Sequence, residues 1–425
     1  MKPLSPVSLS DIKSLTAKQP EAQPNEATEP AKPKKERTPA KPAKAIRVSD
    51  YLADFYEIRY NIVSNELLLR EEGSKDFETL ENEQGLWFEL AENNIDVSVD
   101  LMKNVLIAKA AKFDPLRNYF ENLPEKRGVI DEIARYVQTR GTPDPENPEQ
   151  EIKLNFAHHL KKHLVRTVAC ALDESYFNKQ CLVMIGGQNV GKSSFCEWFL
   201  PPALLDYGSS SFSFDKDGEI ALGGNLLVFL DELANFERTD IKQLKAILAK
   251  QFIKVREPYG KKAIRRPRRA SFFATTNEAE FLTDSTGNVR FVCIELEYIN
   301  FNYSKEIDVD DVWAEAYTLY KSGYKGDLNK AEIAEIERIN AQHSITCVET
   351  ELIQRYFSKP DATNKLHEEH LTATEIKQYI QSYHPSERIN LKKLGEELRR
   401  LIGRPVTARR GNQTPKGYFL VKNNS

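Results

Sequence analysis

Hydrophobic residues in the middle of the chain occur in short, uninterrupted runs. Residues 182–185, 226–230 and 271–275 form three such runs. Runs of this kind are typical of strands that are buried on both faces of a parallel sheet. The segments between them have the periodicity of helices, and this alternation predicts an α/β core over residues 176–300.

The pattern before this core is mostly helical. Ser49 is a suitable cap for a short helix that follows it, and apolar residues over 85–173 recur at helical spacing. Residues 60–69 are an exception, because two apolar stretches flank a Ser-Asn pair and predict a small hairpin. We therefore expect a mainly helical N-terminal domain over residues 46–175. A helical segment over residues 301–344 is expected to follow the core as a lid or linker.

The C-terminal segment, residues 345–425, has its own pattern. Thr372 and Glu375 form a capping box that opens a helix, and residues 391–402 have the spacing of a second, amphipathic helix. Two short apolar stretches within residues 406–421 then predict a hairpin. This order of helix, helix and hairpin predicts a winged-helix domain. The last 55 residues contain 11 Lys or Arg against four Glu, which favours DNA binding; a packing or oligomerisation module is the alternative.

Residues 1–45 differ in composition from the rest of the chain. Eight of the 21 prolines lie there, mixed with Lys, Glu, Ala and Ser. Such a segment cannot bury enough apolar surface to fold, so we expect a disordered tail. Its second half is basic, which fits either a solvated linker or an arm that binds nucleic acid.

Cysteine usage and hydropathy narrow the class of protein. The five cysteines are scattered without a C-x-x-C pair, which favours reduced thiols in the cytoplasm over disulfides or a zinc site. His367 and His370 are three residues apart with no evident third ligand, so they predict a solvated turn rather than a metal site. The polar N-terminus is not a secretory signal, and no apolar run approaches the ~18 residues of a membrane span. The net charge of −3 does not by itself indicate a partner.

A G-x-x-x-x-G-K-S motif directly follows the run 182–185 and precedes a helix start over residues 194–200. Its glycines let the backbone turn so that N–H groups surround a phosphate at the start of the helix. Lys192 would reach the β- and γ-phosphates of ATP, and the Ser193 hydroxyl would be a ligand of magnesium. The residues expected to bind the nucleotide are Gly186, Gly187, Gln188, Asn189, Val190, Gly191, Lys192, Ser193 and Ser194.

Asp231 and Glu232 directly follow the apolar run 226–230. Ligands of open α/β sheets bind beyond the carboxyl ends of the strands, so this pair is a candidate catalytic site. Asp231 would hold magnesium through water, and Glu232 would position and deprotonate the attacking water. Asn277 follows the next apolar run, where its amide would sense the γ-phosphate and orient the water. Arg290 is a candidate arginine finger that reaches a phosphate across a subunit boundary.

A basic hairpin is predicted between the carboxylates and Asn277. Residues 257–260 (E-P-Y-G) fit a type I turn, and the flanking residues alternate between apolar and basic. Residues 254–269 contain eight Lys or Arg and one Glu. This charge suits contacts with the phosphates of DNA, and Tyr259 would stack on a base. A solvated hairpin is the alternative. The expected DNA contacts are Lys254, Arg256, Tyr259, Lys261, Lys262 and Arg265.

Together these segments resemble the virulence-associated protein E family, a group of ATPases of phages and mobile elements that is similar to superfamily-three helicases. The resemblance covers roughly residues 100–330 and includes Trp313-Ala314-Glu315-Ala316. It implies an AAA+-like fold with a five-stranded core and a hexameric ring with nucleotide between subunits. It also implies that the hairpin lines the pore and grips single-stranded DNA. The family usually carries two adjacent arginines after T-G-N, whereas Val289 and Arg290 occupy these positions here.

The combined interpretation is a P-loop ATPase that uses ATP and magnesium. We expect a DNA helicase or translocase for replication of a phage, plasmid or integrative mobile element. Its expected partners are single-stranded or forked DNA, further copies of the chain, and a separate primase or replication initiator. One alternative is an ATPase switch, regulatory or defensive, that binds DNA without unwinding it. Another is an initiator that only marks an origin.

Overall fold

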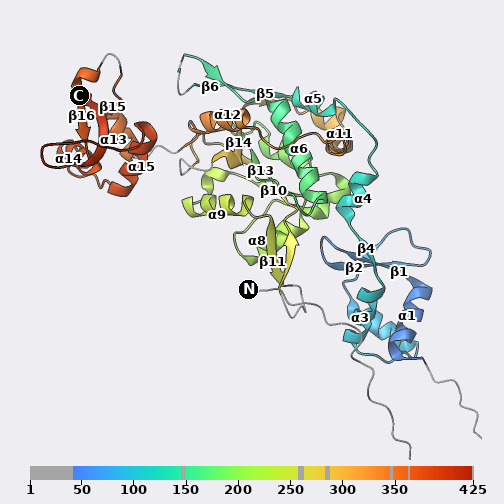
Figure 1. Ribbon diagram of the computed structural model, residues 1–425. Helices are drawn as coiled ribbons and strands as arrows, with labels where there is room; N and C mark the ends of the chain where they lie inside the picture. Colours follow the sequence, from blue (N-terminus) through green and yellow to red (C-terminus); the bar gives the residue numbers. More distant parts are fainter. Residues whose placement is uncertain are drawn as a thin grey trace, which may run out of the picture.

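A computed structural model describes residues 42–144, 147, 149–256, 263–282, 288–344, 348–361 and 364–423. The tail expected over residues 1–45 lies almost entirely outside these residues. The described chain forms an N-terminal unit (residues 44–113), a central unit (115–344) and a C-terminal unit (348–423), which follow one another in Figure 1 from blue to red. No helix of the described residues is both long and apolar enough to span a membrane.

A six-stranded sheet organises the central unit. Five neighbouring strands are parallel, which agrees with the five-stranded core implied by the resemblance, and the sixth, β5, is antiparallel at one edge. The three predicted apolar runs form β8, β10 and β13, whose residues are all buried. In spatial order the strands are β5 (Val137–Thr139), β14 (Phe291–Ile299), β8 (Cys181–Ile185), β13 (Ser271–Thr276), β10 (Leu227–Leu230) and β9 (Gly208–Ser209).

Helices cover both faces of this sheet. Alternate residues of a strand point to opposite faces, so a strand that is apolar throughout needs a hydrophobic core on each side. In β8, Leu182 and Met184 enter one hydrophobic core, whereas Cys181, Val183 and Ile185 enter the other. The second face carries α8 (Lys216–Gly224) and α9 (Arg238–Leu248). The first face carries α4 (Pro115–Glu121), α5 (Val129–Ala134), α6 (Phe156–Leu172), α7 (Lys192–Trp198), α11 (Val309–Lys321) and α12 (Lys330–Asn340).

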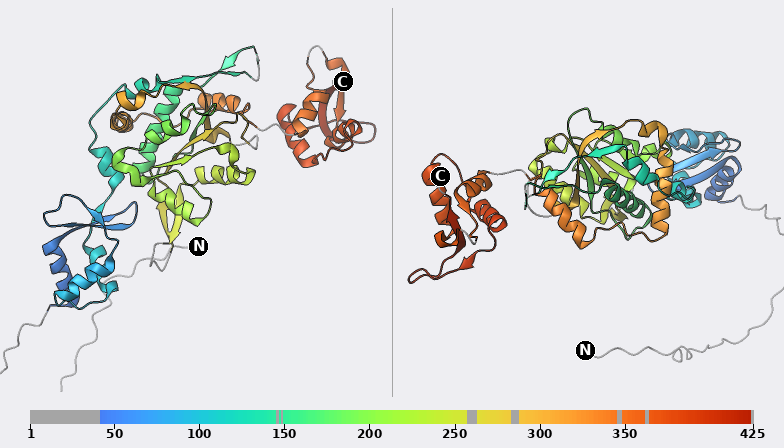
Figure 2. Two further views of the ribbon diagram at one scale, coloured as in Figure 1. Left: turned by 180° about the vertical axis from the view of Figure 1, so that it is seen from behind. Right: turned by 90° about the horizontal axis from the view of Figure 1, so that it is seen from above.

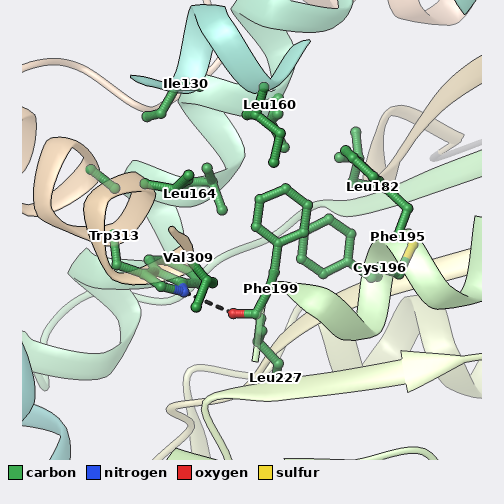
Figure 3. Close-up of a cluster of buried hydrophobic side chains, with 14 of the residues drawn as sticks. Ile130, Leu160, Leu164, Leu182, Phe195, Cys196, Phe199, Leu227, Val309 and Trp313 are labelled. Carbon is green, nitrogen blue, oxygen red and sulfur yellow. Dashed lines mark hydrogen bonds between the residues drawn. The ribbon is translucent and has the colours of Figure 1, made fainter. Parts of the chain in front are cut away.

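The first core draws together residues that are far apart in the sequence. Phe199, at the end of α7, packs there with Leu160 and Leu164 of α6 (Figure 3). The indole nitrogen of Trp313 in α11 donates a 2.7 Å hydrogen bond to the Phe199 carbonyl oxygen. Both aromatic side chains are fully buried, so this contact anchors α11 against the sheet.

The structure divides the first half of the chain differently from the expected helical domain over residues 46–175. Residues 115–172 pack on the central sheet, because α6 is buried along its length and β5 pairs with β14. The rest is a separate unit with a core of its own and four strands, so it is not mainly helical. Its elements are α1 (Lys44–Phe55), β1 (Tyr56–Asn61), β2 (Glu66–Glu71), β3 (Glu78–Thr79), α2 (Glu83–Glu92), α3 (Val99–Lys109) and β4 (Ala111–Phe113).

Two details of the N-terminal unit test the sequence pattern. The predicted hairpin is confirmed, because β1 and β2 pair antiparallel and Asn65 turns the chain with φ = +66°. The helix start after Ser49 is wrong, because α1 already begins at Lys44. Val48 and Leu52 are one turn apart and both buried, so apolar packing extends the helix past the capping signal.

The C-terminal unit consists of three helices and a small sheet (Figure 2), and it has a hydrophobic core of its own. The predicted capping box is confirmed, because Thr372 and Glu375 each bond to the other's backbone N–H. The strands β15, β16 and β17 all pair with β18. The elements are α13 (Val348–Tyr356), β15 (Phe357–Ser358), β16 (Glu368–Leu371), α14 (Ala373–Tyr383), α15 (Leu391–Leu401), β17 (Val406–Thr407) and β18 (Lys416–Lys422).

Candidate functional site

The candidate site lies at the carboxyl edge of the central sheet. β13 pairs with β8 on one side and with β10 on the other, and all three strands are parallel. The residues that follow these strands therefore meet at one edge. Gly186 follows β8, Asp231 follows β10 and Asn277 follows β13.

Residues 186–193, called here the 186–193 loop, comprise the turn after β8 and the first two residues of α7, and they leave little room for a side chain at Gly186 or Gly191. Asn189 and Gly191 adopt left-handed conformations, with φ of +61° and +89°. A Cβ atom on Gly186 would lie 3.0 Å from the Leu296 carbonyl oxygen, and one on Gly191 would lie 2.5 Å from the ring of Phe301. Close approach of other atoms thus favours glycine at both positions, and the left-handed backbone adds a second reason at Gly191. Gly187, Gln188, Asn189 and Ser194 are exposed, whereas Val190 and Ser193 are half-buried.

Lys192 holds its ammonium group over this loop. Its Nζ donates to the carbonyl oxygens of Gly186 at 2.9 Å and Gly187 at 2.7 Å, and to Asn277 Oδ1 at 2.7 Å. The residue is only 6% exposed. Burial lowers the pKa of Lys192, although the nearby carboxylates of Asp231 and Glu232 oppose this shift. A concentrated positive charge is therefore enclosed by three neutral acceptors that an anion can displace.

Asp231 joins the loop to the strand β13. Its Oδ1 accepts a 2.7 Å hydrogen bond from the Ser193 hydroxyl and a second from the Thr275 hydroxyl. Burial alone would raise the pKa of Asp231, but these two hydrogen bonds reverse the shift, and the pKa lies below its usual value. The carboxylate is consequently ionised at neutral pH, with the Ser193 oxygen beside it.

Both carboxylate oxygens of Glu232 are bonded to side-chain amides. Asn277 Nδ2 donates to Oε1 at 3.1 Å, and Asn235 Nδ2 donates to Oε2 at 2.5 Å. The backbone of Glu232 is left-handed, with φ = +51°, and its N–H donates to Thr275 Oγ1 at 3.2 Å. The side chain is exposed and oriented, as a base that acts on water must be.

The sequence analysis did not single out Thr275 and Asn235. The Thr275 hydroxyl bridges the two acidic residues, since it donates to Asp231 and accepts from the Glu232 N–H. Asn235 lies in a short 3₁₀ turn, Leu233–Asn235, that directly follows Glu232. Residues three apart on such a turn lie one above the other, so the spacing of Glu232 and Asn235 was the available signal.

The basic hairpin extends from the opposite, amino edge of the sheet, where β13 begins (Figure 1). It consists of β11 (Phe252–Arg256) and β12 (Ala263–Pro267), which pair antiparallel as predicted. The tip, with Tyr259, Lys261 and Lys262, lies outside the described residues, as does the Arg256 side chain.

Two exposed cations of this hairpin face each other. Lys254 pairs directly with Arg265 across the strands, and both side chains are exposed. The guanidinium of Arg265 lies 3.5 Å from the centre of the Phe252 ring. Like charges in direct cross-strand register destabilise a hairpin, so the pair creates a local site that favours a polyanion.

Three further arginines of this segment, Arg266, Arg268 and Arg269, bond to other parts of the protein, and Arg268 and Arg269 are buried. Arg268 is fully buried and donates to the carbonyl oxygens of Lys250, Ala270, Asn178 and Leu248. The remaining two bridge to other parts of the chain, Arg266 to Ile62 and Asn65 of the N-terminal unit, and Arg269 to Asp114 and Ala171. The net charge of residues 254–269 therefore overstates the charge offered to a ligand.

Arg290 ends a short 3₁₀ turn, Asn288–Arg290, just before β14. β14 is parallel to β8, with Phe291 opposite Cys181 and Glu295 opposite Ile185. Arg290 therefore lies at the amino edge, on the order of 20 Å along the strands from the start of the 186–193 loop. A role for Arg290 at that loop requires a second copy of the chain.

The described part of the chain has no group of three or more His, Cys, Asp or Glu side chains arranged to hold a metal ion. His367 ends the 3₁₀ turn Lys365–His367, while His370 lies in β16 and bonds through Nε2 to the Val406 carbonyl oxygen. The four cysteines of the described residues, Cys170, Cys181, Cys196 and Cys293, are buried and free.

Comparison with known proteins supports the family resemblance. Residues 151–345 match the family model of the virulence-associated protein E-like domain. The resemblance is thus confirmed over these residues, and the matched segment includes the 186–193 loop, both carboxylates and the hairpin. No curated protein matches the chain.

Similar solved structures cover most of the chain at low identity. The apo C-terminal region of NrS-1 in its A form is 10% identical, with a TM-score of 0.49 over 89% of this chain and 99% of that chain. Another apo structure of the same region is 11% identical, with a TM-score of 0.44 over 88% and 98%. SCCmec type IV Cch, described as an active helicase, is 12% identical, with a TM-score of 0.36 over 86% and 93%.

Proposed function

We propose that this protein is an ATP hydrolase that moves along DNA, and that it serves as a helicase or translocase in the replication of a mobile element. The observation that carries the proposal is the convergence of four side chains at the carboxyl edge of the sheet. Lys192, Asp231, Glu232 and Asn277 come from three segments. Asn277 bonds to both Lys192 and Glu232, and Asp231 bonds to Ser193 beside Lys192.

The loop and Lys192 would bind the phosphates of ATP. The ammonium group already has three acceptors, two of them loop carbonyl oxygens. Charged phosphate oxygens are stronger acceptors than these neutral groups, so they would compete for the same protons. The exposed backbone of residues 187–189 would supply N–H donors on the other side of the phosphates.

Ser193 and Asp231 would hold magnesium. Their oxygens are 2.7 Å apart, and oxygen is the ligand that magnesium prefers. Two protein ligands fit this ion, since magnesium usually retains several waters and binds nucleotide phosphates. When bound, it would neutralise charge that develops on the phosphates.

Glu232 and Asn277 would act on the attacking water. Glu232 would accept a proton from it as general base, and the Asn277 amide would orient it against the γ-phosphate. Asn277 contacts both Lys192 and Glu232, so a change at the phosphate would reach the base through one side chain. Arg290, at the far edge of its own sheet, would complete the site of a neighbouring copy in a ring, which we propose to be hexameric.

The hairpin would bind single-stranded DNA. The exposed pair Lys254 and Arg265 carries charge that no described acidic side chain neutralises in its surroundings, and residues 257–262 add Tyr259, Lys261 and Lys262. The C-terminal unit, with its basic composition and two helices before a hairpin, would be a winged-helix domain that binds duplex DNA.

An ATPase assay with and without single-stranded DNA, run beside a forked-duplex unwinding assay, tests this proposal. We expect DNA-stimulated hydrolysis and strand separation, both abolished by Lys192→Ala. Stimulated hydrolysis without strand separation would instead support an ATPase switch. No hydrolysis under any condition would refute the proposed enzyme.

A further inference from the structure

An exposed aromatic ring lies against the candidate phosphate loop. Phe301 follows β14, and its side chain is 50% exposed. Two of its ring carbons, Cε1 and Cζ, lie so close to Gly191 that a Cβ atom there would be 2.5 Å from each. One part of the ring therefore covers the loop, while a large part faces solvent and is free to contact a ligand.

The segment that carries Phe301 is held in place from both sides. The N–H of Asn300 donates to the Tyr136 carbonyl oxygen at 2.8 Å. Tyr303 is buried, and its ring centre lies 5.0 Å from that of Phe195 and 5.3 Å from that of Trp198. Phe195 and Trp198 belong to α7, the helix that begins at Lys192. These contacts on either side of Phe301 fix the position of its backbone relative to the loop.

We infer that Phe301 is the platform on which the base of the bound nucleotide stacks. This inference rests on the proposed nucleotide site. The contacts of Lys192, Ser193 and the loop backbone concern phosphates, so they leave the base of the nucleotide without a partner. An exposed ring beside the loop supplies an apolar face for that base, and base stacking on an aromatic side chain contributes roughly 1–3 kcal/mol.

The chemistry of a stacking platform also predicts the substrate class. Every base has a π-face, so stacking adds affinity without choosing among bases. The platform should therefore bind both ATP and GTP, and loss of the ring should weaken the two to a similar extent. Inorganic tripolyphosphate has no base, so its binding should be independent of Phe301.

The test compares the affinities of wild type, Phe301→Ala, Phe301→Trp and Phe88→Ala for ATP, GTP and tripolyphosphate in magnesium. Phe88 is the matched control, since it is 58% exposed in α2, within the N-terminal unit. Lys192→Ala is included as a variant of the phosphate site. Tryptophan fluorescence of Phe301→Trp, measured against wild type, gives a direct readout of stacking.

We expect Phe301→Ala to lose about tenfold in affinity for ATP and GTP, the equivalent of roughly 1.4 kcal/mol, and nothing for tripolyphosphate. Phe301→Trp should restore affinity, and its added fluorescence should be quenched by ATP but not by tripolyphosphate. Phe88→Ala should match wild type. Equal losses for all three ligands, or no loss for any, would overturn the platform. If wild type and Lys192→Ala bound all three equally weakly, the nucleotide site itself would be refuted.

Discussion

The two edges of the central sheet use charged residues in opposite ways. At the carboxyl edge, residues from distant parts of the sequence contact each other, as Lys192 does with Asn277. At the amino edge, basic residues that are neighbours in the sequence separate, because Arg265 is exposed while Arg268 is fully buried. The difference shows that proximity in space follows strand order rather than sequence distance, and that a basic segment need not be a basic surface.

This contrast has a physical origin. Parallel neighbours place their carboxyl ends together, so β8, β10 and β13 deliver their following residues to one site. A hairpin has two faces, and one face of β11 and β12 packs against the core through Ile253. Arg268 and Arg269 follow the hairpin in the sequence, and their guanidinium groups donate hydrogen bonds to backbone carbonyl oxygens of the core.

The largest effect is expected at the carboxyl edge, from Glu232→Gln. The variant keeps a side chain that can bond to Asn235 or Asn277 but loses the base. ATP hydrolysis should fall by roughly 10²–10⁴ while ATP binding persists. Steady-state assays measure the rate of ATP hydrolysis, and equilibrium titrations measure the affinity for ATP. The control is Glu335→Gln, which removes the same charge from an exposed position of α12 and should leave hydrolysis unchanged. Near-normal turnover in Glu232→Gln would show that Glu232 is not the general base.

The amino edge should respond in stability rather than in activity. Arg268→Ala removes the guanidinium donors of three buried carbonyl oxygens and one part-buried carbonyl oxygen, and one such buried loss already costs roughly 1–3 kcal/mol. We expect destabilisation of at least about 3 kcal/mol in denaturant titrations. Arg265→Ala loses only an exposed cation–π contact, worth roughly 0.5–1 kcal/mol. Equal stability of the two variants would contradict the division into inward and outward arginines.

Thr275→Val removes the hydroxyl that links the two acidic residues and keeps the shape of the side chain. Hydrogen bonds from Thr275 and Ser193 lower the pKa of Asp231 against the effect of burial. Without the first bond this pKa should rise, so the carboxylate should protonate at higher pH than in wild type. The acid limb of magnesium-dependent hydrolysis should shift upward, and hydrolysis at pH 7 should fall about tenfold, as expected for a hydrogen bond to a charged group. An unshifted acid limb would show that Thr275 does not control Asp231.

The smallest effect concerns the exposed cations of the hairpin. The double variant Lys254→Ala/Arg265→Ala should retain basal ATP hydrolysis and lose affinity for single-stranded DNA. The slope of log affinity against log salt should decrease by about 0.7 for each phosphate contact that is lost. A control that replaces Lys325 and Lys330, two exposed lysines near the start of α12, should keep the wild-type slope. An unchanged slope in the hairpin variant would show that Lys254 and Arg265 do not contact DNA phosphates.

The central strands and the 186–193 loop could be predicted because each depends on residues that are close together in the sequence. Three apolar runs gave β8, β10 and β13, and the glycine spacing gave the turn at residues 186–193. The predicted helix start at Ser49 was wrong, because the burial of Val48 stabilises helix on the N-terminal side of this capping residue. The orientation of Arg268 and the partner of Arg266 depend on the packing of distant segments, so no local pattern could reveal them.

We propose that the carboxyl edge of the sheet binds a nucleoside triphosphate through Lys192. Isothermal titration of ATP with magnesium into wild type and Lys192→Ala tests it most directly, with Lys325→Ala as a control for loss of an exposed charge. We predict that wild type and the control bind equally, and that Lys192→Ala binds at least tenfold more weakly. This loss corresponds to one charge-assisted hydrogen-bond donor, worth roughly 1.5–3 kcal/mol. Undiminished binding by a folded Lys192→Ala protein would contradict the account.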